Sequence, residues 1–486
     1  MRRARPVPLR PQRLNPPLRE LQEFYVGKDI RDVPRPVLIM DQAKMRRHCE
    51  SLQQAADSLG VALRTHIKSH KASQDCDAQT PRPVLLITVA QTVEGTELQV
   101  NDKKDVRLIV STVAELELLA KLIDDYVFED RQVNILYGVP LVQSQVTRLA
   151  AISWTMGEAT LSFLVDHPDQ IRLVRRYCHD SLRQVKVFVK VDTGYHRAGL
   201  PPSAINKGDL ISQLLELNEL TILEFAGLYS HSSLSYNGTT PVEAMASLEA
   251  EITGCMDALR NISHMIPKGK KLTISVGASP QVLAVENLVQ GGAEPDAAAQ
   301  SLRAKMQAVM AEGVAGVECE LELHAGVYSV MDMQQLATNA RPNLGSYEEE
   351  IAVSVLSEVV GVYNDGERAQ PEVLLSVGVL GLGREPCPSY KGWGVLDRST
   401  FPPGVMDDRR LIISRISQEH CIVTWDEDSK GNITDPIPVK IGQKVRIFPN
   451  HACITGALYG WYVVVDSSNG RPGLKIVDVW PRASGW

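Results

Sequence analysis

The sequence lacks any apolar run near the roughly 20 residues that a membrane-spanning helix requires. It also lacks an excess of basic residues, because 51 lysines and arginines stand against 58 aspartates and glutamates and give a net charge of -7. This balance argues against nucleic acid as an electrostatic partner. We therefore expect no membrane and no nucleic acid among the partners. A length of 486 residues favours two or three domains.

Tight cysteine spacing is absent as well. The sequence has no CxxC pair, and no secretory signal peptide precedes its scattered cysteines, which stand at positions 49, 76, 178, 255, 319, 387, 421 and 453. Such a pattern is typical of reduced thiols in an intracellular protein. We therefore expect a cytoplasmic location.

The N-terminal segment contains no acidic residue before Glu20, whereas residues 1–19 carry six arginines and five prolines. The prolines oppose the amphipathic helix of a mitochondrial presequence. We interpret residues 1–34 as an N-terminal arm, basic at its start, with organelle targeting as the alternative.

Strand-like and helix-like segments alternate from Arg35 onward. Apolar, β-branched runs occur at 36–40, 62–67, 107–110, 133–136, 161–165, 185–191, 223–229 and 272–276. Segments of good helix formers separate them, such as 113–125, where leucines recur at helical spacing. Eight strands, most of them followed by a helix, favour a (β/α)8 barrel of the α/β class over residues 35–340. A doubly wound open sheet remains the alternative.

The pattern changes after about residue 345, where short strands are separated by Gly, Pro, Asp and Asn and show little helical periodicity. This predicts a separate all-β domain over residues 341–486. Two stretches fit the plan poorly, namely 73–91 and the helical stretch 284–315. We interpret both as insertions.

Reactive side chains follow several of the predicted barrel strands. Lys68 follows the run 62–67, Arg197 follows 185–191, His231 and Tyr236 follow 223–229, and a Gly-Ala-Ser turn at 277–279 follows 272–276. Active sites of such barrels lie at the carboxyl ends of the strands, where loops with small residues often hold phosphate. A lysine that faces a phosphate site suggests a Schiff base with pyridoxal phosphate. Taken singly, each feature has a structural interpretation, such as a solvated lysine at a strand end.

The predicted β domain contains the sequence Phe448-Pro-Asn-His-Ala-Cys453. On an extended strand, side chains two apart point to the same face, so His451 and Cys453 could bind one metal ion. Imidazole and thiolate suit Zn²⁺, and two protein ligands leave positions open for water or substrate. A buried cysteine beside a hydrogen-bonded histidine is the alternative.

Six motifs together resemble one enzyme family. They are RTHIKSHK (64–71), VDTGYHRAGL (191–200), GLYSHSSLSY (227–236), VGASP (276–280), ELHAGVYSVMD (322–332) and PNHACITG (449–456). In this order they resemble the eukaryotic-type D-serine dehydratases and D-threonine aldolases, which are alanine-racemase-like, fold-type III pyridoxal phosphate enzymes. The resemblance spans the chain from about residue 35. It implies a barrel followed by a β domain to which the N-terminal segment also contributes, and it has no counterpart for residues 73–91.

The resemblance implies a role for each matching residue. Lys68 would be the catalytic lysine that carries pyridoxal phosphate, and Arg197 would contact the ring oxygen of the cofactor. His324 would lie by the pyridine nitrogen, and His231 beside the ring. Other positions that match the surroundings of the cofactor and its phosphate are Tyr229, Tyr236, Gly277, Ala278, Ser279, Gly326 and Val327. His451 and Cys453 match the zinc pair of the D-serine dehydratases, whereas D-threonine aldolases usually have aspartate in place of the cysteine.

We therefore expect a zinc- and pyridoxal-phosphate-dependent lyase that converts the D-amino acid D-serine to pyruvate and ammonia. The alternatives are a metal-dependent D-threonine aldolase, a 3-hydroxyaspartate dehydratase, and a non-catalytic pyridoxal phosphate-binding protein. Related folds further imply a homodimer.

Overall fold

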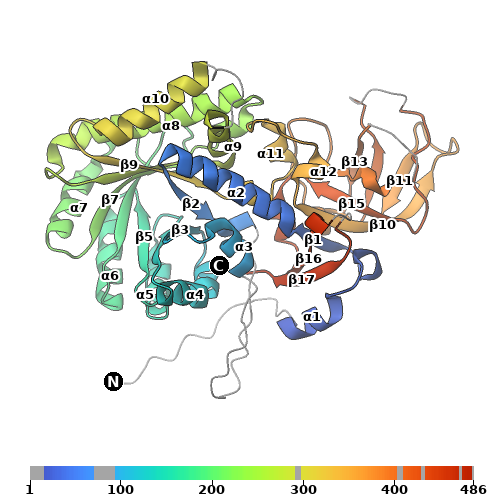
Figure 1. Cartoon of the computed structure of the whole chain (residues 1–486), viewed down its shortest axis with the longest axis horizontal. Coiled ribbons are helices and arrows are strands. Elements are labelled where there is room, and N and C mark those ends of the chain that lie inside the picture. Colours follow the sequence, from blue (N-terminus) through green and yellow to red (C-terminus); the bar gives the residue numbers. More distant parts are fainter. Residues whose placement is uncertain are drawn as a thin grey trace.

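The computed structural model describes residues 16–69, 93–289, 297–401, 409–427, 433–469 and 473–483. Within these ranges the chain forms a closed eight-stranded barrel and, beside it, a nine-stranded sheet (Figure 1). The expected combination of an α/β barrel with a separate β domain is confirmed. The predicted insertion 73–91 and the basic start of the N-terminal arm lie outside the described residues.

The barrel consists of eight parallel strands in chain order, with β2 closing onto β9. The strands are β2 (Ala62–His66), β3 (Asp105–Val110), β4 (Gln132–Tyr137), β5 (Thr160–Val165), β6 (Lys186–Val191), β7 (Glu224–Ser230), β8 (Leu272–Val276) and β9 (Cys319–Ala325). The helices before and between them are α2 (Gln42–Leu59), α3 (Val93–Val100), α4 (Val113–Phe128), α5 (Gln143–Ser153), α6 (Ile171–Ser181), α7 (Leu210–Glu219), α8 (Pro241–Ile262), α9 (Ser279–Leu283) and α10 (Ala297–Glu312).

One of the eight predicted barrel strands belongs to the other sheet. The run 36–40 corresponds to β1 (Val37–Asp41), which pairs with two strands of the β domain, so the barrel does not begin at residue 35. The eighth barrel strand is instead β9, which the sequence pattern missed because Glu320 and Glu322 interrupt its apolar residues. Both carboxylates pair with arginines of other barrel strands, which is how buried charge is accommodated.

The same error explains the supposed insertion at 284–315. Helix α10 lies in this stretch and packs on α8 and β9, so it is the crossover helix that leads from β8 to β9. Because the predicted barrel lacked β9, no strand followed this helix in the prediction. It is an integral part of the barrel.

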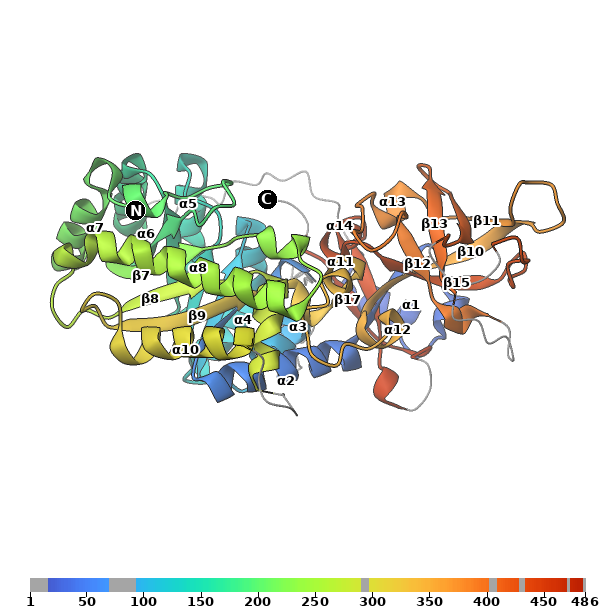
Figure 2. The ribbon, with the colours of Figure 1, turned by 90° about the horizontal axis from the view of Figure 1, so that it is seen from above.

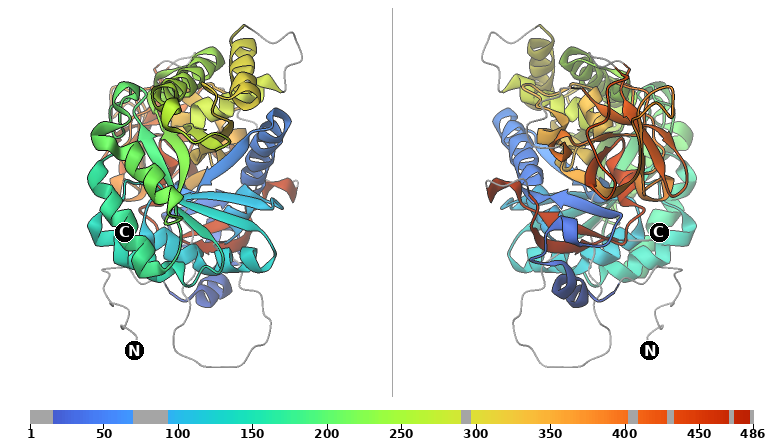
Figure 3. Two further views of the ribbon diagram at one scale, coloured as in Figure 1. Left: turned by 90° about the vertical axis from the view of Figure 1, so that its left-hand side faces the viewer. Right: turned by 90° about the vertical axis from the view of Figure 1, so that its right-hand side faces the viewer.

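The second sheet is mainly antiparallel and has the order β11-β14-β13-β12-β15-β10-β1-β16-β17. Its strands are β1, β10 (Val353–Tyr363), β11 (Glu372–Leu375), β12 (Gly394–Leu396), β13 (Leu411–Ile416), β14 (Cys421–Trp425), β15 (Lys444–Pro449), β16 (Trp461–Val465) and β17 (Ile476–Pro481). Helix α1 (Leu18–Tyr25) packs against β17 at the outer edge of the sheet (Figures 1 and 3). The N-terminal segment therefore contributes to the β domain.

Four short helices complete the described structure: α11 (Met333–Ala337), α12 (Tyr347–Glu350), α13 (Val379–Leu382) and α14 (Ala452–Gly456). Figure 2 shows α11 and α14 at the junction between the barrel and the β domain. Among the described residues, no helix is long and apolar enough to cross a membrane.

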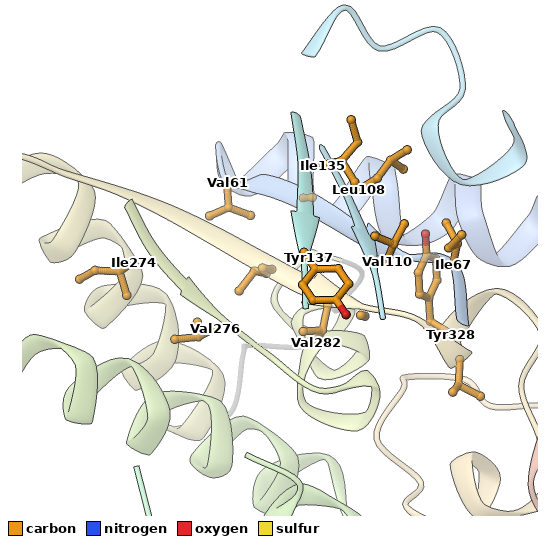
Figure 4. Packing of buried hydrophobic residues seen from close by; sticks show 14 of the residues in the cluster. Val61, Ile67, Leu108, Val110, Ile135, Tyr137, Ile274, Val276, Val282 and Tyr328 are labelled. Carbon is orange, nitrogen blue, oxygen red and sulfur yellow. The ribbon is translucent and has the colours of Figure 1, made fainter. Parts of the chain in front are cut away.

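Alternation along the barrel strands separates two layers of core. Leu108, Ile135 and Ile274 belong to the large cluster that fills the space between the strands and the surrounding helices (Figure 4). Their strand neighbours Ile109 and Leu136 belong to a small cluster inside the barrel. Successive side chains of a strand point to opposite faces, and this alternation produces the two layers. Because the barrel strands are parallel, the residues that follow their carboxyl ends lie at one shared rim.

Candidate active site

The predicted catalytic lysine lies at the end of the first barrel strand. Lys68 belongs to the single helical turn η2 (Ile67–Ser69), which directly follows β2. Its backbone N–H donates to Nδ1 of His66 at 3.2 Å, and Nε2 of His66 lies 3.0 Å from Oγ of Ser111. These contacts fix the turn that presents Lys68 to a cavity of about 530 Å³.

The cavity lies between the barrel and the β domain. Five of the predicted site residues line it together, namely Lys68, Arg197, His231, Tyr236 and His451. His451 comes from the β domain and the other four come from the barrel. The tertiary structure therefore brings together residues that are up to 383 positions apart, from Lys68 to His451.

Arg197 is held in a compact loop after β6. Oδ1 of Asp192 accepts the backbone N–H groups of Gly194 and His196, both at 3.0 Å. Gly199 has a φ of +111°, and a Cβ there would lie 2.8 Å from the backbone nitrogen of Asp192. Only glycine allows this close return of the chain, which presents Arg197 to the cavity.

Three predicted ring residues form a stack behind the cavity. The Tyr229 and His324 rings are parallel within 6°, with centroids 4.3 Å apart, and His231 stacks on the other histidine at 5.5 Å. Burial first, and nearby cationic groups second, lower the pKa values of His231 and His324 well below the usual range. Both imidazoles are therefore neutral at neutral pH.

A chain of hydrogen bonds determines which nitrogen of His324 carries the proton. Oγ of Ser275 lies 2.7 Å from Oε1 of Glu322 and 3.0 Å from Nδ1 of His324. An ionised carboxylate can only accept, so the serine hydroxyl donates to Glu322 and accepts from Nδ1–H of the histidine. Nε2 of His324 is then an acceptor. Nδ1 of His231 lies 3.4 Å from it and can donate to it.

The carboxylate at the start of this chain is held ionised by arginines. Glu322 is fully buried and contacts Arg64 through two bonds of 2.7 and 3.0 Å, and it also contacts Arg107 at 2.9 Å. Burial alone would raise the pKa of Glu322, but the two arginines lower it to about 2. Arg64 and Glu322 had no predicted role. Both are charged residues inside otherwise apolar strands, and this feature of the sequence could have indicated that they are functional.

A third residue without a predicted role is Lys190, which is buried on β6 with its Nζ 4.8 Å from the Tyr229 ring centroid. Burial, together with the charge of Arg197, lowers the pKa of Lys190 to about 8. This adds to the cationic surroundings of the ring stack.

The turns after β8 and β9 form a small cup. Gly277 has a φ of +148°, and a Cβ there would lie 2.3 Å from the carbonyl oxygen of His324. Oγ of Ser279 accepts the backbone N–H groups of Val327 at 3.1 Å and Gly326 at 3.4 Å. Both N–H groups are used by this hydroxyl in the structure, and together with the hydroxyl they could donate to a phosphate bound in its place as acceptor. Ala278, which lies between Gly277 and Ser279 in the sequence, is buried and forms the N-cap of α9.

The predicted metal pair has a different local structure from the one expected. Strand β15 ends at Pro449, His451 is the N-cap of α14, and Cys453 lies in the first turn of that helix. The prediction that both residues lie on one extended strand is therefore wrong, because Nδ1 of His451 accepts the N–H of Ile454 at 3.3 Å and starts a helix. The two side chains still flank one turn, and α14 packs against the η2 turn that carries Lys68.

Asp332 holds this turn from the barrel side. Its buried carboxylate accepts the N–H of Ala452 at 2.8 Å and the N–H of Gln335 at 2.9 Å. One side chain thus caps α11 and α14 together. Burial raises the pKa of Asp332, against the opposing effect of His451. Within the described ranges, no group of three or more His, Cys, Asp or Glu side chains is placed to hold a metal.

Comparisons with known proteins agree with this arrangement. Residues 40–293 match the family described as "Alanine racemase, N-terminal domain", and residues 352–465 match "Putative serine dehydratase domain". A D-serine dehydratase of Schizosaccharomyces pombe is 30% identical over 97% of both chains. A D-serine dehydratase of Saccharomyces cerevisiae is 26% identical over 95% of this chain and 98% of its own.

Solved structures show the same fold. D-threo-3-hydroxyaspartate dehydratase from Delftia sp. HT23 has a TM-score of 0.67 and 21% identity over 94% of this chain and 100% of its own. An alanine racemase-like protein from Idiomarina loihiensis has a TM-score of 0.65 and 23% identity over 95% of this chain and 100% of its own. The chain therefore belongs to the D-serine dehydratase family of alanine-racemase-like, fold-type III pyridoxal phosphate enzymes.

Proposed function

We propose that this protein is a D-serine ammonia-lyase that uses pyridoxal phosphate to convert D-serine to pyruvate and ammonia by β-elimination. The observation that carries the proposal is the cavity that Lys68 of the barrel and His451 of the β domain line together. It joins a lysine at a barrel strand end with a side chain that can bind a metal. The curated relatives from the two yeasts are D-serine dehydratases.

The residues present fit pyridoxal phosphate. The cup at Gly277, Ser279 and Val327 suits its phosphate, because a side chain at Gly277 would collide with the backbone and the converging donors suit an anion. Lys68 would hold the aldehyde carbon, and Arg197 would bind the ring oxygen. When bound, the cofactor withdraws electrons from the α-carbon of the amino acid and makes its α-proton acidic.

The ring stack would orient the cofactor by hydrogen bonding and by excluding water. Nε2 of His324 is an acceptor in the network described above, so it could accept from a protonated pyridine nitrogen in place of Nδ1–H of His231. The Tyr229 ring stacks on this imidazole. Arg64 and Glu322 keep the network in one protonation state.

Lys68 would take the α-proton of the substrate, since it is the lysine that lines the cavity. Elimination also requires departure of the β-hydroxyl. The released aminoacrylate would hydrolyse to pyruvate and ammonia in solution.

His451 and Cys453 fit a zinc ion, because an imidazole and a thiolate are the ligands that zinc prefers. The ion would act as a Lewis acid on the leaving hydroxyl. Asp332 would hold the two ligands in register through its bond to Ala452.

Cavity charge favours D-serine over 3-hydroxyaspartate. Among the described residues, Lys68 and Arg197 are the only lysine and arginine that line the cavity, and the proposal uses both for the cofactor. A second substrate carboxylate would therefore find no lysine or arginine beyond those used for the cofactor. The cysteine ligand, in place of aspartate, argues against a D-threonine aldolase.

Incubation of the purified protein with single substrates tests the proposal. We expect pyruvate from D-serine and none from L-serine. Glycine and acetaldehyde from D-threonine would instead indicate an aldolase, and faster turnover of D-threo-3-hydroxyaspartate would indicate the other dehydratase. A protein that binds pyridoxal phosphate and turns over none of these would be a cofactor-binding protein without this activity.

The resemblance to related folds also supports a homodimer, in which the partner's β domain faces the barrel rim. Sedimentation equilibrium of the cofactor-loaded protein checks this assembly, and a monomer at micromolar concentration would contradict it.

A further inference from the structure

A stripe of basic side chains lies on α6, remote from the cavity that holds Lys68. Arg172, Arg175, Arg176 and His179 recur at positions i, i+3, i+4 and i+7 of this helix, so they share one face. The opposite face carries buried residues such as Val174 and Tyr177. Figures 1 and 2 show α6 at the end of the barrel away from the β domain.

The stripe borders a cavity of about 830 Å³. Arg183, Gln184 and Thr221 line it together with the cations of α6. Leu182 and Ile222 add apolar lining. The cavity thus combines cationic groups, hydrogen-bonding groups and apolar surface.

Positive charge in this cavity is largely uncompensated. Among the described residues, Asp180 is the only carboxylate that lines it, and its oxygens already contact Nε of Arg176 at 3.2 Å and Nδ1 of His179 at 3.0 Å. Arg183 donates to the carbonyl oxygen of Gly157. In the part of the chain that the structure describes, neither Arg172 nor Arg175 has an ion pair.

This arrangement has no evident benefit for folding. Like charges three and four residues apart on a helix destabilise it by roughly 0.2–0.5 kcal/mol per pair. Only one of the three arginines on α6 gains a carboxylate in return. The surplus of guanidinium groups around a concave surface is the arrangement that binds phosphate groups through paired N–H donors.

We propose that this cavity binds a polyphosphate-bearing anion, either an inorganic polyphosphate or a nucleoside triphosphate. A cavity of about 830 Å³ exceeds the space that one phosphate needs. The cavity is lined by Gln184, two residues before β6 begins at Lys186, whereas Arg197 follows the end of β6 at Val191. At roughly 3.3 Å per residue, the two sites are roughly 17 Å apart along the strand. The ligand therefore occupies a site separate from the cofactor.

Calorimetric titration of the cofactor-loaded protein with tripolyphosphate and, separately, ATP tests this inference. The variant Arg172→Gln/Arg175→Gln removes the two arginines without an ion pair. The control Lys121→Gln/Arg260→Gln removes two surface cations on α4 and α8, whose partners are Asp125 and Asp257. Both double variants change the net charge equally, so a non-specific charge effect would appear in both.

We expect saturable binding to the wild-type protein, weakening by at least roughly tenfold in the cavity variant because charge-assisted bonds are lost. The control should bind within about twofold of the wild type. ATP binding more tightly than tripolyphosphate identifies a nucleotide site, and equal affinities identify a polyphosphate site. Absence of saturable binding of both compounds, or equal affinities of the cavity variant and the wild type, would overturn the inference. Turnover of D-serine is not needed for this test.

Discussion

Replacing the buried Glu322 by glutamine should destabilise the barrel by an amount that depends on pH. The carboxylate has a pKa of about 2 in the folded protein, against a reference value of 4.5. At about 1.4 kcal/mol per pKa unit, the difference of about 2.5 units corresponds to roughly 3 kcal/mol at pH 7. Breaking a buried ion pair by removing one partner typically costs roughly 3–5 kcal/mol, so two independent arguments agree.

The sign of the pH dependence follows from the lowered pKa. Stabilisation by Glu322 is fully present above its unfolded pKa, at about pH 4.5, and is lost as the pH falls through about 2. The free-energy difference between the wild-type protein and Glu322→Gln should therefore shrink from roughly 3 kcal/mol at pH 7 to roughly 1 kcal/mol at pH 3. The glutamine also places an amide group against arginine donors. This contact adds a pH-independent contribution to the free-energy difference between the two proteins.

Urea unfolding of cofactor-free protein, followed by tryptophan fluorescence and far-UV circular dichroism at several pH values, measures this difference. Glu320→Gln is the matched control, because Glu320 lies two residues away on β9 and also pairs with Arg107, but its side chain is 31% exposed. The control should lose less than about 1 kcal/mol. A loss of equal size in both variants, or a loss for Glu322→Gln that does not change with pH, would refute the reasoning.

Four further variants test the candidate site. Lys68→Ala should abolish both the visible absorbance of bound pyridoxal phosphate and turnover of D-serine; retention of either would show that another lysine does this work. Ser279→Phe should weaken the affinity for pyridoxal phosphate by crowding the phosphate cup. Arg197→Ala should instead keep the cofactor and slow turnover. The reverse pattern in cofactor titrations would mean that the two loops are wrongly assigned. Asp332→Asn should lower zinc affinity by roughly tenfold or more, because asparagine keeps only one of the two oxygens that accept from Gln335 and Ala452. The visible absorbance of the bound cofactor should stay unchanged. Unaltered zinc binding by atomic absorption would contradict a positioning role.

Motifs at strand ends were predictable because reactive residues directly follow apolar runs. Lys68, Arg197 and His231 were placed correctly at one rim, since parallel strands of a barrel end on the same side. For the metal pair His451 and Cys453, the expected extended strand was wrong, and their joint binding of a metal stays a prediction. An N-cap depends on where the backbone turns after Pro449, and the alternation of side chains along a strand carries no information about that turn.

The sequence was sufficient to predict an α/β barrel with a following β domain, in preference to a doubly wound sheet, and to locate the reactive side chains along the chain. The assignment of strands to sheets required the tertiary structure. The apolar run of β1 suits either sheet, because a fully buried strand has the same pattern in both, and β9 was hidden by Glu320 and Glu322, whose charges are paired with arginines only in the closed barrel. The same holds for the Arg64–Glu322–Ser275–His324 network. Its members are distant in sequence, and their charges become favourable only when barrel closure removes water and places arginine against carboxylate.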